Sequence, residues 1–274
     1  MSRMLRHAAG TLRACEKNRV ERLSESQLHD TECRATLRMP PATLSGPIRG
    51  ALFDMCNVLY DATVWRRWVL RLLSRLGVYT NYHCFFRVWD REYLGEVQRG
   101  DRDFWEAFES FLRSVGLSGG QIDEVKAAST ARRRQLEKST HPLPGVRTTL
   151  GRLHKAGLVL GVACDSFYPS SFLRECLDRF AVGRMFSVVV SSLDLKRTMP
   201  DPIVYRTALD AMNLPPEEVV FVGHDAVELE GATAMGMPTV AFNFDPNAKA
   251  DVYITCFNAL PEVLETLPPL AAAS

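Results

Sequence analysis

GALFDMCNVLYDATVW (residues 50–65) carries the strongest structural signal in the sequence. Its apolar residues Ala51, Leu52 and Phe53 form a short run that stops at Asp54. A short, uninterrupted apolar run is typical of a strand that is buried on both faces of a parallel sheet. We therefore expect a buried strand that places the carboxylate of Asp54 at its C-terminal end.

The chain after Pro142, Pro144 and Gly145 alternates between strand-like and helix-like segments. These three residues separate the two patterns, because proline and glycine favour turns. The expected strands are 158–164, 187–192, 219–223 and 238–242, and the expected helices are 146–156, 170–180, 202–212 and 228–235. This alternation predicts an α/β fold with a Rossmann-like parallel sheet and helices on both faces of the sheet.

Between the first strand and this alternating region, the sequence favours helices. The clearest helical patterns cover residues 64–76 and 104–116, where apolar side chains recur at helical spacing. We interpret residues 65–140 as an α-helical cap inserted into an α/β core that comprises residues 49–64 and 141–265.

The two ends of the chain are expected to lie outside the core. Residues 1–48 are rich in Arg, Ser, Thr and Glu and lack a sustained apolar period, which predicts a disordered extension. A short amphipathic helix over residues 5–23 is the alternative. Residues 266–274 are interpreted as a C-terminal tail.

The overall composition argues against several classes of function. A net charge of +1 gives no global field that would recruit nucleic acid or an anionic membrane. No apolar run approaches the roughly 18–20 residues needed to cross a bilayer. The seven cysteines are odd in number and lack C-x-x-C spacing, which favours a cytoplasmic protein over a secreted disulfide framework. We expect a small anionic molecule as the partner, and the sequence gives no signal for oligomeric state.

Polar side chains follow several of the expected strands. Asp54, Cys164, Ser192 and His224 stand at or just past four strand ends. In open parallel sheets, ligands bind outside the carboxyl ends of the strands. The sequence therefore predicts that these four side chains converge on one pocket.

Four segments resemble, in order, the motifs of the haloacid dehalogenase superfamily. The first motif reads roughly FDxDGTLxD, and residues 53–61 resemble it with the sequence FDMCNVLYD. The second region of the family is a helix followed by a strand that ends in Ser or Thr. Residues 142–166 resemble it with the sequence PLPGVRTTLGRLHKAGLVLGVACDS. The third motif usually contains Lys-Pro-Asp-Pro, and residues 197–209 resemble it with the sequence RTMPDPIVYRTAL. The fourth motif usually reads Gly-Asp-Ser-x-x-Asp-x-x-Gly-Ala, and residues 219–242 resemble it with the sequence VVFVGHDAVELEGATAMGMPTVAF. The resemblance covers about residues 50–245 and implies the superfamily's α/β core with a helical cap.

The resemblance implies a catalytic role for several residues. Asp54 matches the aspartate on which family members form a covalent intermediate. Cys56 stands where the family's phosphatases carry an aspartate that protonates the leaving group, and a thiol is a weak general acid. Cys164 stands where the family uses Ser or Thr to bind the transferring group. Asp165, which follows Cys164, is a candidate substrate-binding residue.

The cation of the third motif is missing from its usual position. Met199 aligns with the family's lysine, which neutralises the nucleophile and the phosphoryl oxygens. Lys196 or Arg197 could replace that lysine, or both could be solvent-exposed loop charges. Arg66 and Arg197 are further candidates for binding an anionic substrate.

The fourth motif implies a metal site with altered ligands. Asp54, His224, Asp225 and Glu228 are its candidate ligands, with His224 in place of the family's Mg²⁺-binding aspartate. Mg²⁺ prefers oxygen ligands, so the implied Mg²⁺ site is weakened. Zn²⁺ or another transition metal is the alternative, because Cys, His and carboxylate groups suit such ions.

The two cysteines near Asp54 allow three interpretations. Cys56 and Cys164 could contribute to that transition-metal site, could form a reversible disulfide, or could simply fill space at buried strand ends.

Three functions follow from these observations. The leading hypothesis is a phosphatase that acts on a small phosphorylated metabolite through an aspartyl nucleophile. A catalytically degenerate binding protein is the first alternative, since three supporting positions are altered. A dehalogenase-like hydrolase is the second.

Overall fold

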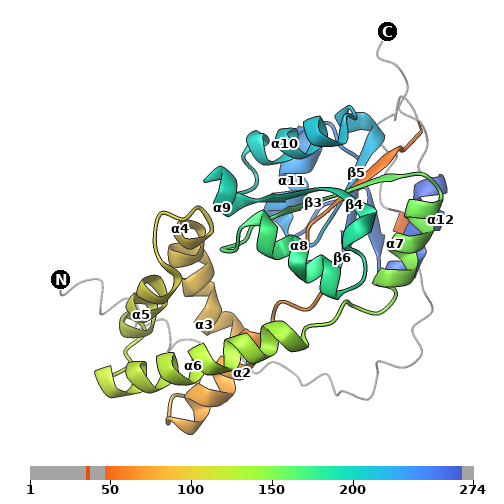
Figure 1. Cartoon of the computed structure of the whole chain (residues 1–274). Helices are drawn as coiled ribbons and strands as arrows, with labels where there is room; N and C mark the ends of the chain where they lie inside the picture. Colours follow the sequence, from red (N-terminus) through yellow and green to blue (C-terminus); the bar gives the residue numbers. More distant parts are fainter. Residues whose placement is uncertain (1–34, 38–46, 267–274) are drawn as a thin grey trace. The chain divides into compact units, whose positions relative to one another are not determined.

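The computed structural model describes residues 35–37 and 47–266 of the 274-residue chain (Figure 1). The described residues fall into two compact units. One unit is helical and extends from Ala62 to Thr140, and the other combines the described residues before Ala62 with those from His141 onward. Residues 1–34, 38–46 and 267–274 lie outside the description.

The second unit is built on a seven-stranded sheet with the order β1-β7-β6-β5-β2-β3-β4. Only the β1–β7 pair is antiparallel, and the other neighbouring strands are parallel. The strands are β1 Ala35–Leu37, β2 Gly50–Phe53, β3 Val159–Cys164, β4 Phe186–Ser191, β5 Val219–Gly223, β6 Thr239–Phe242 and β7 Val252–Ile254. The predicted parallel sheet is confirmed, and β2, the strand that precedes Asp54, is an inner strand of it.

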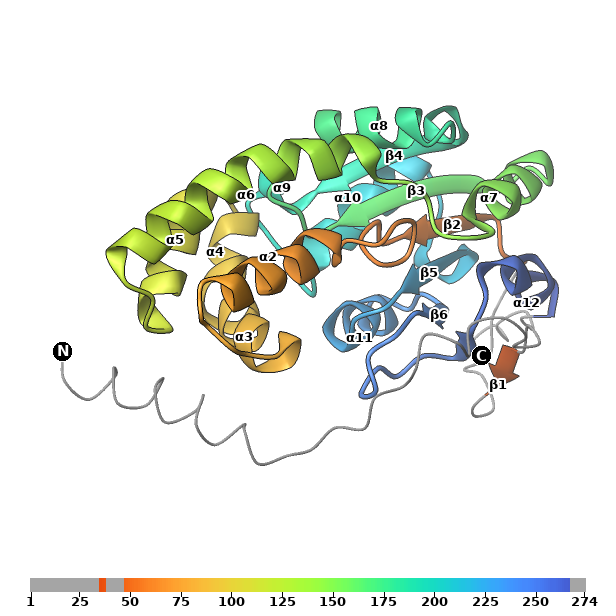
Figure 2. The same ribbon diagram turned by 90° about the horizontal axis from the view of Figure 1, so that it is seen from below.

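Helices cover both faces of this sheet (Figure 2). One buried cluster joins α7, α8 and α12 to one face, and a second joins α10 and α11 to the other. These helices are α7 Val146–Lys155, α8 Ser170–Arg179, α10 Pro202–Met212, α11 Ala226–Ala234 and α12 Leu260–Thr266, and a short helix α9 spans Ser192–Leu195. Short 3₁₀ turns occupy Gly183–Met185, Pro216–Glu218 and Phe257–Ala259. The predicted α/β architecture is therefore confirmed.

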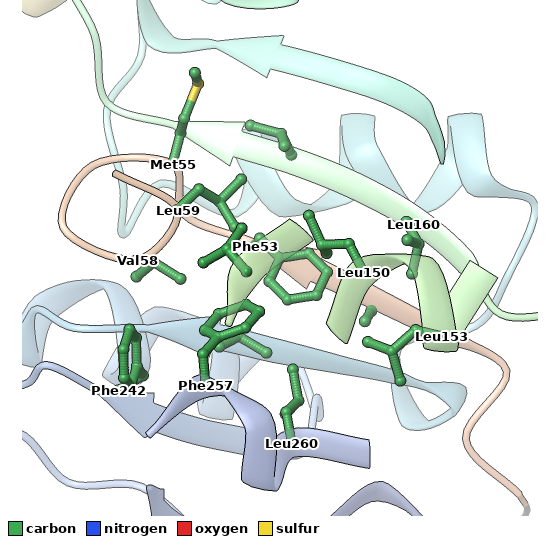
Figure 3. Close-up of a cluster of buried hydrophobic side chains, with 14 of the residues drawn as sticks. Phe53, Met55, Val58, Leu59, Leu150, Leu153, Leu160, Phe242, Phe257 and Leu260 are labelled. Carbon is green, nitrogen blue, oxygen red and sulfur yellow. The ribbon is translucent and has the colours of Figure 1, made fainter. Parts of the chain in front are cut away.

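Strand β2 contributes to both faces of the sheet. Ala51 and Phe53 belong to the first buried cluster, whereas Leu52 belongs to the second, as the alternation of side chains along a strand requires. Figure 3 shows Phe53 among the side chains of the first cluster, and its ring packs against those of Phe186 and Phe257 at centroid distances of 6.2 and 6.1 Å. The backbone of β2 is thus fixed from both sides directly before Asp54.

The helical unit consists of α2 Val64–Arg75, α3 Tyr82–Trp89, a π-helical turn Asp90–Leu94, α4 Gly95–Gln98, α5 Phe104–Ser114 and α6 Gly119–Ser139. Aromatic side chains form much of its interior, among them Phe85, Trp89, Phe108 and Phe111. The helices predicted at 64–76 and 104–116 are present as α2 and α5. Within the described part of the chain, no helix is both long enough and apolar enough to cross a membrane.

Asp103 directly precedes α5 and caps its first turn, which allows a test of the stability of the helical unit. Its Oδ1 accepts hydrogen bonds from the backbone N–H groups of Trp105 and Glu106, at 2.8 and 3.1 Å. Loss of such a cap typically costs about 1 kcal/mol. We expect Asp103→Ala to lower the free energy of unfolding by about that amount in urea titrations. Asp103→Asn should stay close to the wild type, since asparagine caps equally well, and equal losses in both variants would contradict this role.

Several elements were not predicted from the sequence, among them the short helix α9. β7 and α12 lie in a region that we expected only to belong to the core. Ala35–Leu37 form β1, which differs from the disordered extension expected over residues 1–48, although most of that segment lies outside the described residues. Helix α11 begins at Ala226 and not at the expected residue 228, because the side chain of Asp225 accepts a hydrogen bond from the backbone N–H of Val227 and caps the helix.

Candidate active site

Asp54 and His224 lie at the ends of two adjacent parallel strands. β2 pairs with β5, with Phe53 opposite Val222, and the backbone N–H of Asp54 donates to the carbonyl of Val222 at 3.0 Å. His224 follows Gly223, the last residue of β5. Glu228 lies in the first turn of α11, four residues after His224. The sheet register and this helical turn therefore bring the three side chains to one place.

The three side chains direct polar atoms toward one another. Nδ1 of His224 lies 3.2 Å from Oδ2 of Asp54 and 3.5 Å from Oε2 of Glu228. The exposed fractions of the three side chains are 18% for His224, 1% for Asp54 and 11% for Glu228. None of these three atoms forms a geometrically acceptable hydrogen bond with another described residue. We refer to Asp54, His224 and Glu228 as the acidic-histidine cluster.

The charges of the acidic-histidine cluster shift the pKa values of its own members. Burial alone would lower the pKa of His224, but the adjoining carboxylates of Asp54 and Glu228 outweigh it and raise that pKa to about 11. Burial raises the pKa of Glu228 to about 7, and the nearby charge of Asp54 adds to the effect. With a pKa of about 11, the imidazole of His224 carries a proton at neutral pH. A metal ion that binds Nδ1 must displace this proton.

The donor set of the cluster suits a divalent cation. One oxygen or nitrogen atom from each of the three side chains lies within 4.8 Å of the others, so the three atoms could share one cation. Two carboxylates and one imidazole suit ions such as Zn²⁺ or Mn²⁺ better than Mg²⁺, which prefers oxygen ligands only. Asp225, also predicted as a ligand, is not a member of this cluster, because its carboxylate caps α11.

Asn57 contacts the cluster and was missed by sequence reasoning. Its Nδ2 lies 3.2 Å from Nε2 of His224, the ring nitrogen that is not directed at the carboxylates. Rotation of the amide presents either oxygen or nitrogen to the ring, so Asn57 can fix the imidazole in either protonation state. Its φ of 59° lies in the left-handed region, which asparagine tolerates better than most residues. An asparagine three residues after Asp54 was the available signal.

Cys56 and Cys164 meet beside Asp54. Their Sγ atoms are 3.7 Å apart, and Sγ of Cys56 is 3.4 Å from the hydroxyl of Tyr60. Cys164 is buried, and Cys56 is partly exposed. The hydrogen bond with Cys56 and burial both raise the pKa of the Cys164 thiol. Neither thiol belongs to the acidic-histidine cluster, so the interpretation of both as ligands of its cation gains no support from the geometry.

Lys196 and Arg197, the predicted replacements for the family's lysine, form no hydrogen bond with Asp54 in the described part of the chain. Arg197 is exposed, with its Nε 3.4 Å from Asp201 and one guanidinium nitrogen donating to the carbonyl of Lys196. Lys196 is exposed as well and ends α9 with a left-handed φ of 53°. Within the described ranges, neither residue forms an ion pair with Asp54. Among the described residues, the basic group next to Asp54 is His224, and the role predicted for Lys196 or Arg197 stays a prediction.

Met199 and Asp165 link two of the motif segments. The backbone N–H of Met199 donates to Oδ1 of Asp165 at 3.1 Å, while the Met199 side chain is buried. Burial raises the pKa of Asp165 to about 8, and the neighbouring carboxylates add to the effect. The protonated form of the Asp165 carboxyl is therefore favoured at neutral pH. Asp165 holds the loop after Arg197 to the end of β3, in addition to the substrate-binding role predicted for it.

Arg66 belongs to the helical unit and is engaged there. Its guanidinium donates two hydrogen bonds to the carboxylate of Asp90, at 2.9 and 2.6 Å, and lies over the ring of Phe86 at 5.0 Å. These contacts restrain the side chain within its own unit. They give no support to the predicted substrate-binding role of Arg66.

Comparison with known proteins adds three findings. The family model described as haloacid dehalogenase-like hydrolase matches residues 48–236. A phosphoglycolate phosphatase of Salmonella paratyphi A is 30% identical over 131 residues, which are 45% of this chain and 51% of that enzyme. The matched part thus spans about half of the length of that relative.

Solved structures show the same architecture. A HAD-superfamily hydrolase of subfamily IA from Geobacter sulfurreducens has a TM-score of 0.59 and 21% identity, over 81% of this chain and 99% of the other. A dehalogenase has a TM-score of 0.55 and 26% identity, over 76% of this chain and 90% of the other. The first of these likenesses concerns the fold alone.

Proposed function

The chain belongs to the haloacid dehalogenase-like hydrolase family, and from this we propose that it hydrolyses the phosphate ester of a small metabolite with Asp54 as the nucleophile. The observation that carries the proposal is the placement of Asp54 at the carboxyl end of an inner parallel strand, within the acidic-histidine cluster. The similarity to a phosphoglycolate phosphatase supports a phosphate ester as the substrate class.

The proposed reaction has two steps. A carboxylate oxygen of Asp54 attacks phosphorus, and the bond between phosphorus and the ester oxygen breaks, so that the alcohol leaves with the bonding electrons and takes up a proton. Water then attacks the aspartyl phosphate, which releases inorganic phosphate and restores the carboxylate. Formation of a covalent intermediate replaces one difficult step by two easier ones.

Local contacts support this role for Asp54. Its Oδ1 accepts the backbone N–H of Met55 at 2.7 Å, and its backbone N–H is bonded to β5. A nucleophile that is already held in place loses little conformational freedom on reaching the transition state.

A divalent cation would complete the charge balance of the site. When bound, it would neutralise the carboxylates and offset the charge of the phosphoryl oxygens. Asp54, His224 and Glu228 are the residues that would hold it, with Asn57 bonded to the second ring nitrogen of His224. Because one ligand is an imidazole nitrogen, we propose Zn²⁺ or Mn²⁺ as the preferred ion over Mg²⁺.

One observation favours a binding protein without catalysis as the second candidate. Among the described residues, no lysine or arginine forms an ion pair with Asp54, and the buried Met199 occupies the position of the family's lysine. A site with less positive charge stabilises a transferring phosphoryl group less well.

A substrate panel separates these functions. The purified chain is incubated with phosphate monoesters and with 2-haloacids, each in the presence of Mg²⁺, Mn²⁺, Co²⁺ or Zn²⁺ and in chelator. Release of inorganic phosphate is the expected result. Halide release without a metal would point to a dehalogenase, and no turnover by a folded protein that still binds a phosphate ester would point to the binding function.

Metal binding can be tested independently of turnover. We expect the wild-type protein to bind about one equivalent of Zn²⁺ or Mn²⁺ in isothermal titration calorimetry, and His224→Ala to bind at least about 100-fold more weakly. Loss of a residue that only supports a ligand already costs about 10- to 100-fold, so loss of a ligand should cost no less. Asp225→Asn is the matched control, because it removes an adjacent carboxylate while asparagine still caps α11. Equal affinity of His224→Ala and wild type would contradict the assigned ligands.

A further inference from the structure

We propose that Cys56 and Cys164 form a redox-active thiol pair that a hydroperoxide oxidises reversibly to a disulfide. This modification site is separate from the acidic-histidine cluster, although it adjoins the same strand end. Its formation requires neither turnover nor a bound metal.

The two sulfur atoms are already in contact. Their separation of 3.7 Å is close to the sum of two sulfur radii, and a disulfide bond requires about 2.05 Å. Cys164 is the last residue of β3, and Cys56 lies in the loop after the neighbouring parallel strand β2, whose Phe53 is paired to Val162 of β3. Neighbouring strands lie about 4.8 Å apart, which is within the range of backbone separations that disulfides span. Closing the remaining gap requires the loop that carries Cys56 to move toward β3.

The two thiols differ in exposure in a way that suits sequential oxidation. Cys56 is partly exposed and can meet a small oxidant, whereas Cys164 has no exposed surface. The hydroxyl of Tyr60, 3.4 Å from Sγ of Cys56, can donate a hydrogen bond to the sulfur. A partly exposed thiol with a resolving cysteine beside it is the arrangement found in redox-sensitive sites. Cys56 is thus the attacking thiol and Cys164 the resolving one.

The chemistry balances with a hydroperoxide as the oxidant. The sulfur of Cys56 attacks one oxygen of hydrogen peroxide, the O–O bond breaks, and a sulfenic acid and one water form. The sulfur of Cys164 then attacks the sulfenic sulfur, and the hydroxyl leaves as a second water with the thiol proton of Cys164. Two thiols lose two electrons in total, and the peroxide gains them. A small dithiol reverses the change by thiol–disulfide exchange.

Disulfide formation would also affect the neighbouring site. Cys56 lies two residues after Asp54 and directly before Asn57, which contacts His224. Drawing Cys56 toward β3 would shift this loop, and displacements of about 1 Å can lower activity considerably. This consequence for activity rests on the proposed function, whereas the disulfide itself does not.

Peptide mapping of the whole chain tests the disulfide directly. The reduced protein is treated with hydrogen peroxide, its remaining thiols are alkylated, and it is digested without reductant. We expect a cross-linked pair of peptides that contains Cys56 and Cys164, about 2 Da lighter than the sum of the two free peptides, and its loss on treatment with dithiothreitol. Under the proposed function, the same treatments should lower phosphatase activity and restore it.

Matched variants identify the pair. Cys176 is a partly exposed cysteine on α8, with its Sγ 2.9 Å from a guanidinium nitrogen of Arg179, so Cys176→Ser should leave the cross-link unchanged. Cys164→Ser should abolish the cross-link and let Cys56 accumulate sulfinic acid, which adds two oxygen atoms. If wild-type Cys56 gains oxygen without the cross-link, or stays reduced while Cys176 reacts, the proposal is overturned. The peptide map gives this answer even if the enzyme has no measurable phosphatase activity.

Discussion

Asp54→Asn is expected to lower kcat/KM for the best phosphate monoester at least about 1,000-fold, because the amide cannot attack phosphorus to form the covalent intermediate. Asparagine has nearly the shape of aspartate, and its amide oxygen can keep the hydrogen bond from the backbone N–H of Met55. The change therefore removes the nucleophile with little disturbance of the strand end. The measurement is initial rates of phosphate release at several substrate concentrations.

Asp201→Asn is the control for this experiment. Asp201 caps α10 through a hydrogen bond from the backbone N–H of Ile203, and asparagine preserves such a cap. We expect the control to retain nearly wild-type activity and both variants to unfold at similar urea concentrations. Activity that survives in Asp54→Asn would exclude Asp54 as the nucleophile. A similar loss in both variants would show that the assay reports on stability.

Phe53→Ala is expected to lower the free energy of unfolding by about 3–5 kcal/mol. The side chain is fully buried, and its ring packs against Phe186 and Phe257 in the cluster of Figure 3. Truncation would remove apolar contacts and leave a cavity in the strand that positions Asp54. Urea unfolding, followed by tryptophan fluorescence and circular dichroism, gives the measurement.

Two further variants calibrate the effect of Phe53→Ala. Phe53→Leu keeps most of the apolar volume and should cost clearly less. Ile203→Ala removes an apolar side chain that is 42% exposed, and we expect a change within about 0.5 kcal/mol. A loss below about 1 kcal/mol for Phe53→Ala would mean that the cluster relaxes around the missing ring, and would contradict the rigid support inferred for Asp54.

The parallel sheet was predictable because its signals are local. The apolar run before Asp54 and the strand 219–223 are each bounded by polar or turn-forming residues, and the observed β5 has the predicted bounds. Since carboxyl ends of parallel strands share one edge, the meeting of Asp54 with His224 and of Cys56 with Cys164 followed from topology.

Other features depend on contacts that spacing does not encode. Arg197 could be placed near Asp54 by counting residues, yet its charge is engaged by Asp201, four residues further along the same loop. Asp225 was predicted as a metal ligand, and the structure shows that its Oδ1 caps α11, a role that also suits a carboxylate directly before a helix. Asn57 reaches His224 only because its backbone adopts a left-handed conformation.

Strand β1 has a consequence for the handling of this protein in solution. The outer edge of β7 would otherwise present unpaired backbone groups, and such an edge is a template for pairing with a second molecule. Three residues, Ala35–Leu37, occupy that edge in antiparallel orientation, and a strand this short is a poor template itself. Shortened versions of the chain that begin after Leu37 would uncover β7 and favour self-association into aggregates.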